Sequence, residues 1–112
     1  MTRPKVKLIA GVLYPDGDET WFAWTLNKLE ALWGKHESVS SSVPFTATDY
    51  YKNIAPRLAR RFVCFEGTAY AGELPDWKLA SIEIEEKSRN PRIVNIDPGY
   101  VDGARLVLNR VG

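Results

Sequence analysis

Hydrophobic and polar positions repeat along this chain with two different periods, which predicts strands and helices in a definite order. Residues 5–14 (KVKLIAGVLY) alternate and then run apolar before a PDGD turn sequence, which is typical of a central strand. In residues 19–33 apolar side chains recur every three or four positions, which predicts an amphipathic helix. Asp18 is placed to cap the start of this helix, and Gly34 to end it in the left-handed conformation.

One side chain of this helix falls outside its apolar stripe. Trp24 lies nearly opposite the stripe at about 100° per residue, and the stripe itself is formed by Phe22, Leu26, Leu29 and Trp33. A tryptophan in this place indicates a second contact surface, formed by more chain, a partner subunit or a ligand. Single exposed aromatic side chains are also common in monomers, so both interpretations stay open.

The middle of the chain predicts an edge strand followed by an inner strand. Residues 36–45 (HESVSSSVPF) place alternate apolar side chains on one side, and Pro44 is typical of an edge strand or a strand end. A short helical turn is expected to begin at Thr48 or Asp49. Residues 61–66 (RFVCFE) then predict the inner strand, with a buried Cys64.

Residues 73–90 (ELPDWKLASIEIEEKSRN) fit two patterns. Trp77, Ala80, Ile84 and Ser88 form a helical face, whereas Ala80 to Ile84 also alternate as a strand does. The length of the segment, its early Pro–Asp pair and its Glu and Lys content favour the helix.

The segment VNIDPGY (residues 94–100) is expected to bend the chain between a strand at 92–96 and another at 104–111. Pro98–Gly99 suits a type II turn. Asn95 and Asp97 share one face, with Ile96 opposite, and Tyr100 is free to pack back over the turn. Two interpretations account for these residues. They form a structural turn, or they form one wall of a binding site that presents two hydrogen-bond acceptors and a phenol.

The order strand, helix, strand, strand, helix, strand predicts a ferredoxin-like split βαβ sandwich of the α+β class. We expect an antiparallel sheet with two helices on one face and an extra C-terminal strand. At 112 residues the chain is expected to form one domain, 1–112.

Composition and charge narrow the class of protein. Hydrophobic residues at 45% with 26% charged residues are typical of a folded soluble protein. A net charge of +1 disfavours nucleic-acid binding. No apolar run reaches transmembrane length and no signal-peptide pattern is present, so no membrane partner is expected. The single Cys64 suits a reducing cytoplasm.

No motif for a known reaction is present, so no catalytic residue is assigned and the question of enzymatic activity stays open. The sequence lacks a phosphate-loop motif. His36 is the single histidine, which predicts a solvated loop side chain rather than a metal ligand. We therefore expect no metal and no cofactor.

Two clusters of polar residues are candidates for binding. TDYY and RLARR lie close together in the sequence and combine tyrosines with guanidinium groups, which bind phosphate or carboxylate in a planar fork. A solvated basic turn, with Arg57 or Arg60 paired to Asp49 or Glu66, is the alternative. Together with NIDPGY they give the candidate ligand-binding residues Asp49, Tyr50, Tyr51, Arg60, Arg61, Asn95, Asp97 and Tyr100.

These segments, with RRFVCFE, ELPDWKLASIEIE and RIVNIDPGYVDGARLVL, resemble the bacterial domain-of-unknown-function family 4416 over nearly the whole chain. TDYY and VNxDPGY are the most specific parts of the resemblance. Some members carry a GTP-binding label, but the resemblance implies no established activity. The family's members look longer than this chain, so the resemblance implies a shortened member or a fragment.

Two functional hypotheses follow. The first is a domain that binds an anionic small molecule, such as a nucleotide or a phosphorylated metabolite, where TDYY, the arginines and NIDPGY converge on one cleft. The second is a non-enzymatic interaction module or homodimer that uses the Trp24 face or the edge strand at 38–43. Single-stranded RNA binding ranks last, because Phe62 and Phe65 fall on opposite faces of their strand.

Overall fold

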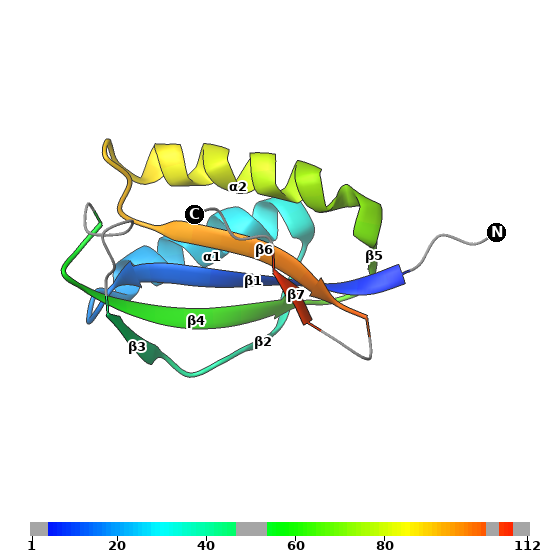
Figure 1. The fold of residues 1–112 in the computed structure, drawn as a ribbon, viewed down its shortest axis with the longest axis horizontal. Coiled ribbons are helices and arrows are strands. Elements are labelled where there is room, and N and C mark those ends of the chain that lie inside the picture. Colours follow the sequence, from blue (N-terminus) through cyan, green and yellow to red (C-terminus); the bar gives the residue numbers. More distant parts are fainter. Residues whose placement is uncertain (1–4, 47–53, 103–105, 109–112) are drawn as a thin grey trace.

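The chain folds into one antiparallel sheet with two helices packed on the same side of it (Figure 1). The computed structural model describes residues 5–46, 54–102 and 106–108. The helices are α1 (Glu19–Trp33) and α2 (Leu74–Ser88), and α2 follows a short 3-10 turn. The strands are β1 (Lys5–Pro15), β2 (His36–Val39), β3 (Val43–Thr46), β4 (Arg57–Phe65), β5 (Ala69–Tyr70), β6 (Asn95–Val101) and β7 (Leu106–Leu108).

The strand order is β2-β4-β1-β6-β7, and β3 and β5 pair with β4 and β1 respectively. All these pairings are antiparallel. This is the order that a split βαβ unit produces, since each helix carries the chain across one intervening strand. The expected ferredoxin-like α+β fold, with its extra strand at the C-terminal end, is confirmed.

The main core lies between the helices and the side of the sheet that faces them, which we term the helix face. Even-numbered residues of β1 point there, because side chains alternate along a strand. They pack against both helices in one buried cluster that includes Val12, Tyr14, Phe22, Leu29, Trp77 and Ile84. The opposite side of the sheet is the far face, where a smaller cluster joins Leu13, Leu58 and Ile54.

The segment NIDPGY is a strand, so the expected turn is wrong. Asp97, Pro98 and Gly99 pair in β6 with Gly11, Ala10 and Ile9 of the central strand. The expected strand at 92–96 begins only at Asn95. Burial decided this outcome, because residues 94 to 99 are all buried and a chain in this position needs the hydrogen bonds of the sheet.

Pro98 fits this strand because of the direction in which its nitrogen points. The backbone N–H of Ile96 faces away from β1 and donates to the Glu85 carboxylate at 2.7 Å. Pro98 lies two residues further along the strand, so its nitrogen also faces away from β1. Its missing N–H therefore removes no hydrogen bond from the β1–β6 pairing.

Three further expectations about strands change. Residues 36–45 form two short strands, β2 and β3, that both pair with the outer side of β4. β4 begins at Arg57, four residues before the expected start at 61, so Arg60 lies within the strand together with Arg61. β5 is a strand that the Gly- and Ala-rich sequence did not predict. The helical turn expected at Thr48 or Asp49 lies outside the described residues.

Both helices form where they were predicted, with α2 slightly shorter than the segment 73–90 and with differences at the ends of α1. Asp18 precedes α1 but makes no side-chain capping bond; its carboxylate accepts from the Thr20 hydroxyl. Gly34 has the expected positive φ of 91° but ψ of −177°, which is outside the left-handed helical region. Within the described ranges, no helix is long and apolar enough to cross a membrane.

Candidate functional site

The two neighbouring arginines of β4 point to opposite faces of the sheet. Arg61 points to the helix face, where its Nε donates to the Tyr14 hydroxyl at 3.0 Å. Its NH2 lies 2.8 Å from the Glu19 carboxylate, and its guanidinium lies over the Phe22 ring. Arg61 therefore joins the sheet to the start of α1 and is not brought together with Arg60.

Arg60 points to the far face and is stacked on aromatic rings. Its guanidinium carbon lies 4.6 Å from the centroid of the Phe45 ring and 5.8 Å from that of Phe62. Its NH2 lies 4.0 Å from Asp97 Oδ2. Of the predicted ligand-binding residues, Arg60, Asn95 and Asp97 are thus brought together across three neighbouring strands.

Asp97 is a buried carboxylate between two cations. Its side chain is 3% exposed, and Lys78 Nζ lies 3.8 Å from Oδ1, whereas Arg60 approaches the other oxygen, Oδ2. Asn95 Nδ2 donates to Oδ2 over a long 3.4 Å. Among the described residues, Oδ1 has no hydrogen-bond donor within reach. The carboxylate is therefore held mainly by charge, and its removal leaves two cations with reduced compensation.

Two charged residues of α2, which the sequence did not single out, hold the outer edge of β6. Glu85 accepts from the Ile96 N–H at 2.7 Å, and Lys78 Nζ donates to the Ile96 carbonyl at 3.0 Å. Burial raises the pKa of the Glu85 carboxyl above its usual range, although Lys78 and Arg92 act against this shift. The sequence did contain a signal for this position. Lys78 and Glu85 are seven residues apart, which is two helical turns, and each directly follows an apolar residue of the buried side, Trp77 or Ile84.

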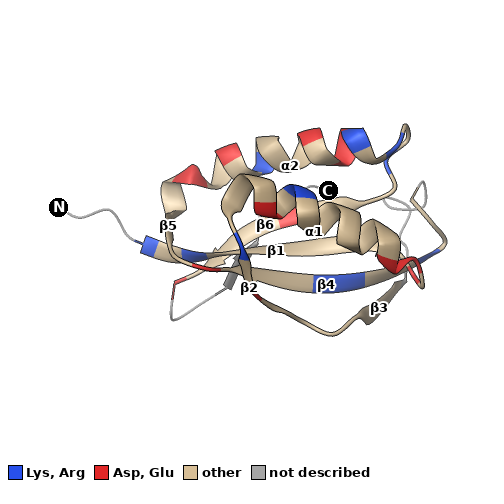
Figure 2. Cartoon of the chain, turned by 180° about the vertical axis from the view of Figure 1, so that it is seen from behind, with Lys and Arg blue, Asp and Glu red and all other residues tan. Residues whose placement is uncertain are grey.

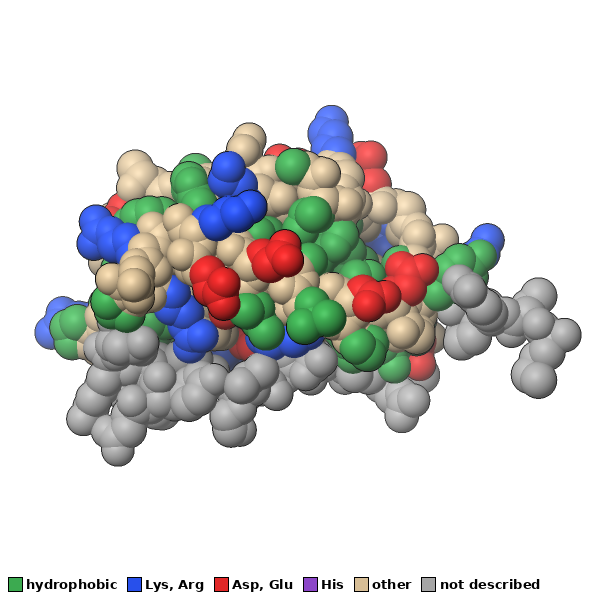
Figure 3. Space-filling view, turned by 90° about the horizontal axis from the view of Figure 1, so that it is seen from above, with side chains coloured by type: hydrophobic (Ala, Val, Ile, Leu, Met, Phe, Trp, Pro, Cys, Tyr) green, Lys and Arg blue, Asp and Glu red, His purple; other side chains and the backbone are tan. Residues whose placement is uncertain are grey.

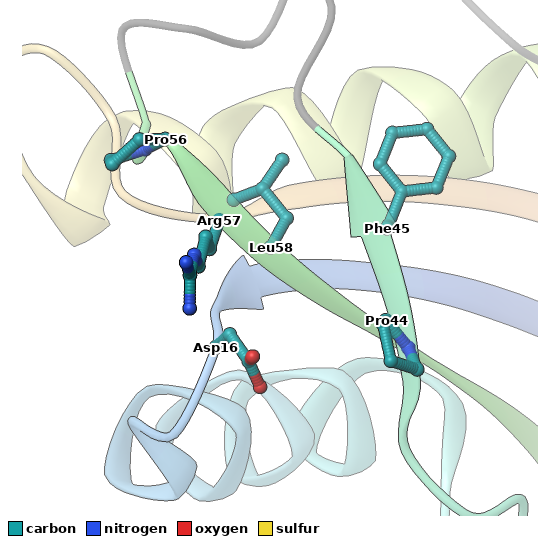
Figure 4. Close-up of a pocket in the computed structure, with 6 residues that line it drawn as sticks. All are labelled: Asp16, Pro44, Phe45, Pro56, Arg57 and Leu58. Atoms are coloured by element: carbon teal, nitrogen blue, oxygen red, sulfur yellow. The ribbon is translucent and has the colours of Figure 1, made fainter.

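A pocket of about 370 Å³ lies at the rim of the sheet, where β3 meets the start of β4. We term it the rim pocket; its described lining residues are Asp16, Pro44, Phe45, Pro56, Arg57 and Leu58 (Figure 4). Arg57 and Asp16 lie on one side of the pocket and Phe45 on the other (Figure 4). The Arg60 guanidinium stacks on the Phe45 ring. Phe45 therefore contacts both the rim pocket and the charged cluster of Arg60 and Asp97 on the far face.

The comparison with protein families gives one match that covers nearly the whole chain. A family model described as "Domain of unknown function (DUF4416)" matches residues 4–111. The chain belongs to this family. No curated protein and no solved structure matches the chain. Membership in the DUF4416 family therefore brings no assigned activity, and the site has to be argued from its own chemistry.

The other predicted residues of this DUF4416 chain are placed differently. Asp49, Tyr50 and Tyr51 lie outside the described residues, so the expected convergence of TDYY with NIDPGY stays a prediction. The described residues on either side of them, Phe45 and Ile54, both pack on the far face. Tyr100 lies on the helix face against the core, opposite Asp97, because NIDPGY is a strand and not a turn.

Trp24 is half-buried rather than free on the surface. The Trp24 ring packs edge-on against the Trp21 ring, with 5.3 Å between the two centroids. Lys28 Nζ lies 5.6 Å from the centroid of the Trp24 ring. Both tryptophans contact the main core. The position of Trp24 opposite the apolar stripe predicted a second contact surface. Contacts within the chain account for part of that surface.

Cys64 and His36 show no arrangement for catalysis or metal binding. Cys64 is half-buried rather than buried, and burial together with the Glu37 carboxylate raises the pKa of its thiol. His36 lies in β2 instead of a loop, with Nδ1 2.9 Å from Glu30 Oε2. No group of three or more potential metal ligands occurs in the part of the chain that the structure describes.

Proposed function

We propose that the chain binds a small molecule with an anionic group, a class that includes nucleotides and phosphorylated metabolites, in the rim pocket. The observation that carries this proposal is the pairing of a guanidinium with an aromatic wall in one pocket. Arg57 offers a planar donor fork that suits phosphate or carboxylate, and Phe45 and the prolines offer apolar surface. A volume of about 370 Å³ lies within the range of small-molecule sites.

The neighbourhood of the pocket supports an anionic ligand. Arg60 lies on the Phe45 ring, so a ligand against that ring has a second guanidinium close by. Acidic and basic residues are interspersed along the two helices (Figure 2), so neither helix is uniformly basic. We place this function in the cytoplasm, which the single cysteine favours.

A thermal-shift screen against nucleotides, phosphorylated metabolites and small carboxylates, α-amino acids among them, tests the proposal. A ligand at ten times its Kd stabilises the native state by about 1.4 kcal/mol, which is a measurable shift of several degrees in a domain of this size. We expect Arg57→Gln to remove the shift. Lys5→Gln is the matched control, because it removes one positive charge at the opposite end of β1. No stabilisation of the wild type, or a full shift in Arg57→Gln, overturns the proposal.

A second candidate function is self-association through the outer surface of the helices. Leu32 and Leu79 are 50% and 64% exposed, and hydrophobic side chains gather on this surface among charged ones (Figure 3). A hollow of about 180 Å³ between α1 and α2 is lined by groups of both signs, among them Lys28 and Glu83. A two-fold dimer brings the same surface of both copies together, so that groups of both signs are available for pairing across it.

Sedimentation at increasing protein concentration tests this second candidate. We expect a concentration-dependent dimer, which Leu32→Asp converts to a monomer. This substitution does not change the far-face cluster, in which Leu13 is buried. A wild-type chain that stays monomeric at millimolar concentration rules out self-association as its function.

A further inference from the structure

The two charged side chains of the rim pocket lie close together without pairing. The Asp16 backbone N–H donates to the Arg57 carbonyl at 3.1 Å, so the two side chains start from neighbouring positions. Both line the same pocket and both are exposed (Figure 4). Over the described residues, neither the Asp16 carboxylate nor the Arg57 guanidinium forms an ion pair or a side-chain hydrogen bond.

Among its described lining residues, the pocket thus has one cation, one anion and an apolar wall. A carboxylate and a guanidinium that do not bind each other keep their hydrogen-bonding positions for a third group. The other described lining residues, Pro44, Phe45, Pro56 and Leu58, bring only apolar side chains. A complementary ligand therefore has an anionic group, a cationic group a short distance from it, and an apolar part.

We propose that the ligand of the rim pocket is a zwitterion, namely an α-amino acid with an apolar or aromatic side chain. This inference rests on the function proposed above, since the carboxylate of the amino acid is the anionic group that Arg57 binds. The ammonium group is bound by Asp16. The side chain packs against Phe45 and the two prolines, where an aromatic ring stacks on an aromatic ring.

Charge distinguishes this ligand from the other members of the anionic class. A phosphate ester with two negative charges meets Arg57 favourably but places both charges beside the Asp16 carboxylate, which repels them. An α-amino acid has a single negative charge, and its ammonium turns the same Asp16 into a binding partner. The pocket thus selects for a ligand in which a cationic and an anionic group are attached to the same carbon atom.

Three related ligands separate the contributions of the two charges. L-Phenylalanine has both charges, 3-phenylpropionate lacks the ammonium, and 2-phenylethylamine lacks the carboxylate. Calorimetric titration of the wild type should give at least fivefold tighter binding of L-phenylalanine than of either analogue. Asp16→Asn should weaken L-phenylalanine about fivefold without weakening 3-phenylpropionate, which loses a repulsive charge, whereas Arg57→Gln should weaken both. Lys5→Gln serves as the control for a general loss of charge.

The outcomes distinguish this inference from the function on which it rests. Equal affinity for L-phenylalanine and 3-phenylpropionate, with no effect of Asp16→Asn, overturns the zwitterion while leaving anion binding at Arg57 intact. Binding of a phosphorylated ligand through Arg57, with none of the three phenyl compounds bound, also overturns it. If no anion binds in a manner that depends on Arg57, both proposals fail together. Circular dichroism of each variant confirms that the fold is unchanged.

Discussion

Removal of the Glu85 carboxylate should destabilise the fold because this side chain holds the outer edge of β6. Glu85 is 3% exposed in its side chain and accepts from the Ile96 N–H at 2.7 Å. It also lies 3.4 Å from Arg92 NH1, at the end of the segment that leads into β6. Glu85→Ala leaves a buried N–H without an acceptor and reduces the compensation of two cations, Lys78 and Arg92.

The size of the effect follows from these losses. A buried donor left unsatisfied costs about 1–3 kcal/mol, and breaking a buried ion pair from one side costs about 3–5 kcal/mol in well-packed cases. The Arg92 contact is long, so we expect a loss of about 3 kcal/mol for Glu85→Ala. Glu85→Gln keeps an oxygen for the Ile96 N–H and should change stability by no more than about 1 kcal/mol at pH 7.

The pH dependence of stability adds an independent test. Burial raises the pKa of Glu85 above its ordinary value of 4.5, so the native chain retains a proton that the unfolded chain has released. The stability that this group contributes is therefore fully present below about pH 4.5 and is lost as the pH rises through the raised pKa. Glu85→Gln has no group that titrates at this position. Its free energy of unfolding relative to the wild type should therefore improve as the pH rises from about 4.5 through the raised pKa of Glu85.

Urea denaturation followed by tryptophan fluorescence measures these differences, since the buried Trp77 lies on the same helix, α2, as Glu85. At about 4 °C per kcal/mol, Glu85→Ala should also lower Tm by about 12 °C. Equal losses in the Ala and Gln variants would show that the charge, and not the acceptor for Ile96, stabilises the strand. A loss below about 1 kcal/mol in Glu85→Ala would refute the role of Glu85 at this edge.

Two further substitutions test contacts away from the rim pocket. Tyr14→Phe should cost about 1.5 kcal/mol in urea denaturation, because the fully buried Tyr14 accepts a charge-assisted hydrogen bond from Arg61; an unchanged midpoint would contradict this. Glu37→Gln should speed alkylation of Cys64 by iodoacetamide at pH 8, because the Glu37 carboxylate helps to raise the pKa of the thiol. An equal or slower rate, measured by mass spectrometry, would count against that contact.

The elements that local periodicity describes were predicted well, and the one that tertiary burial decides was not. Residues 19–33 and 74–88 show helical spacing over four turns, and both helices form there. The Pro98–Gly99 pair is a strong local turn signal, yet the segment is a strand. Local sequence does not reveal that the nitrogen of Pro98 faces away from β1, nor that the central strand needs a partner on this side.

The candidate site was predicted in part for similar reasons. Asn95 and Asp97 were expected on one face, and the period of two that places them there is local. The approach of Arg60 to Asp97 depends on the pairing of both β4 and β6 with β1, which spacing alone does not supply. Arg61 was grouped with Arg60 because the start of β4 was placed four residues too late, which hid their alternation across the strand.

Titration of 15N-labelled protein with 3-phenylpropionate, followed at the side-chain Nε–H signals of the arginines, tests the central claim most directly. This probe has the anionic group and an apolar ring but no ammonium, so its result does not depend on the zwitterion proposal. We predict a saturable shift of the Arg57 Nε–H signal, with Arg61 unmoved because it is bound to Tyr14 and Glu19 on the helix face. An Arg57 signal that stays in place, or moves no more than that of Arg61, would contradict anion binding in the rim pocket.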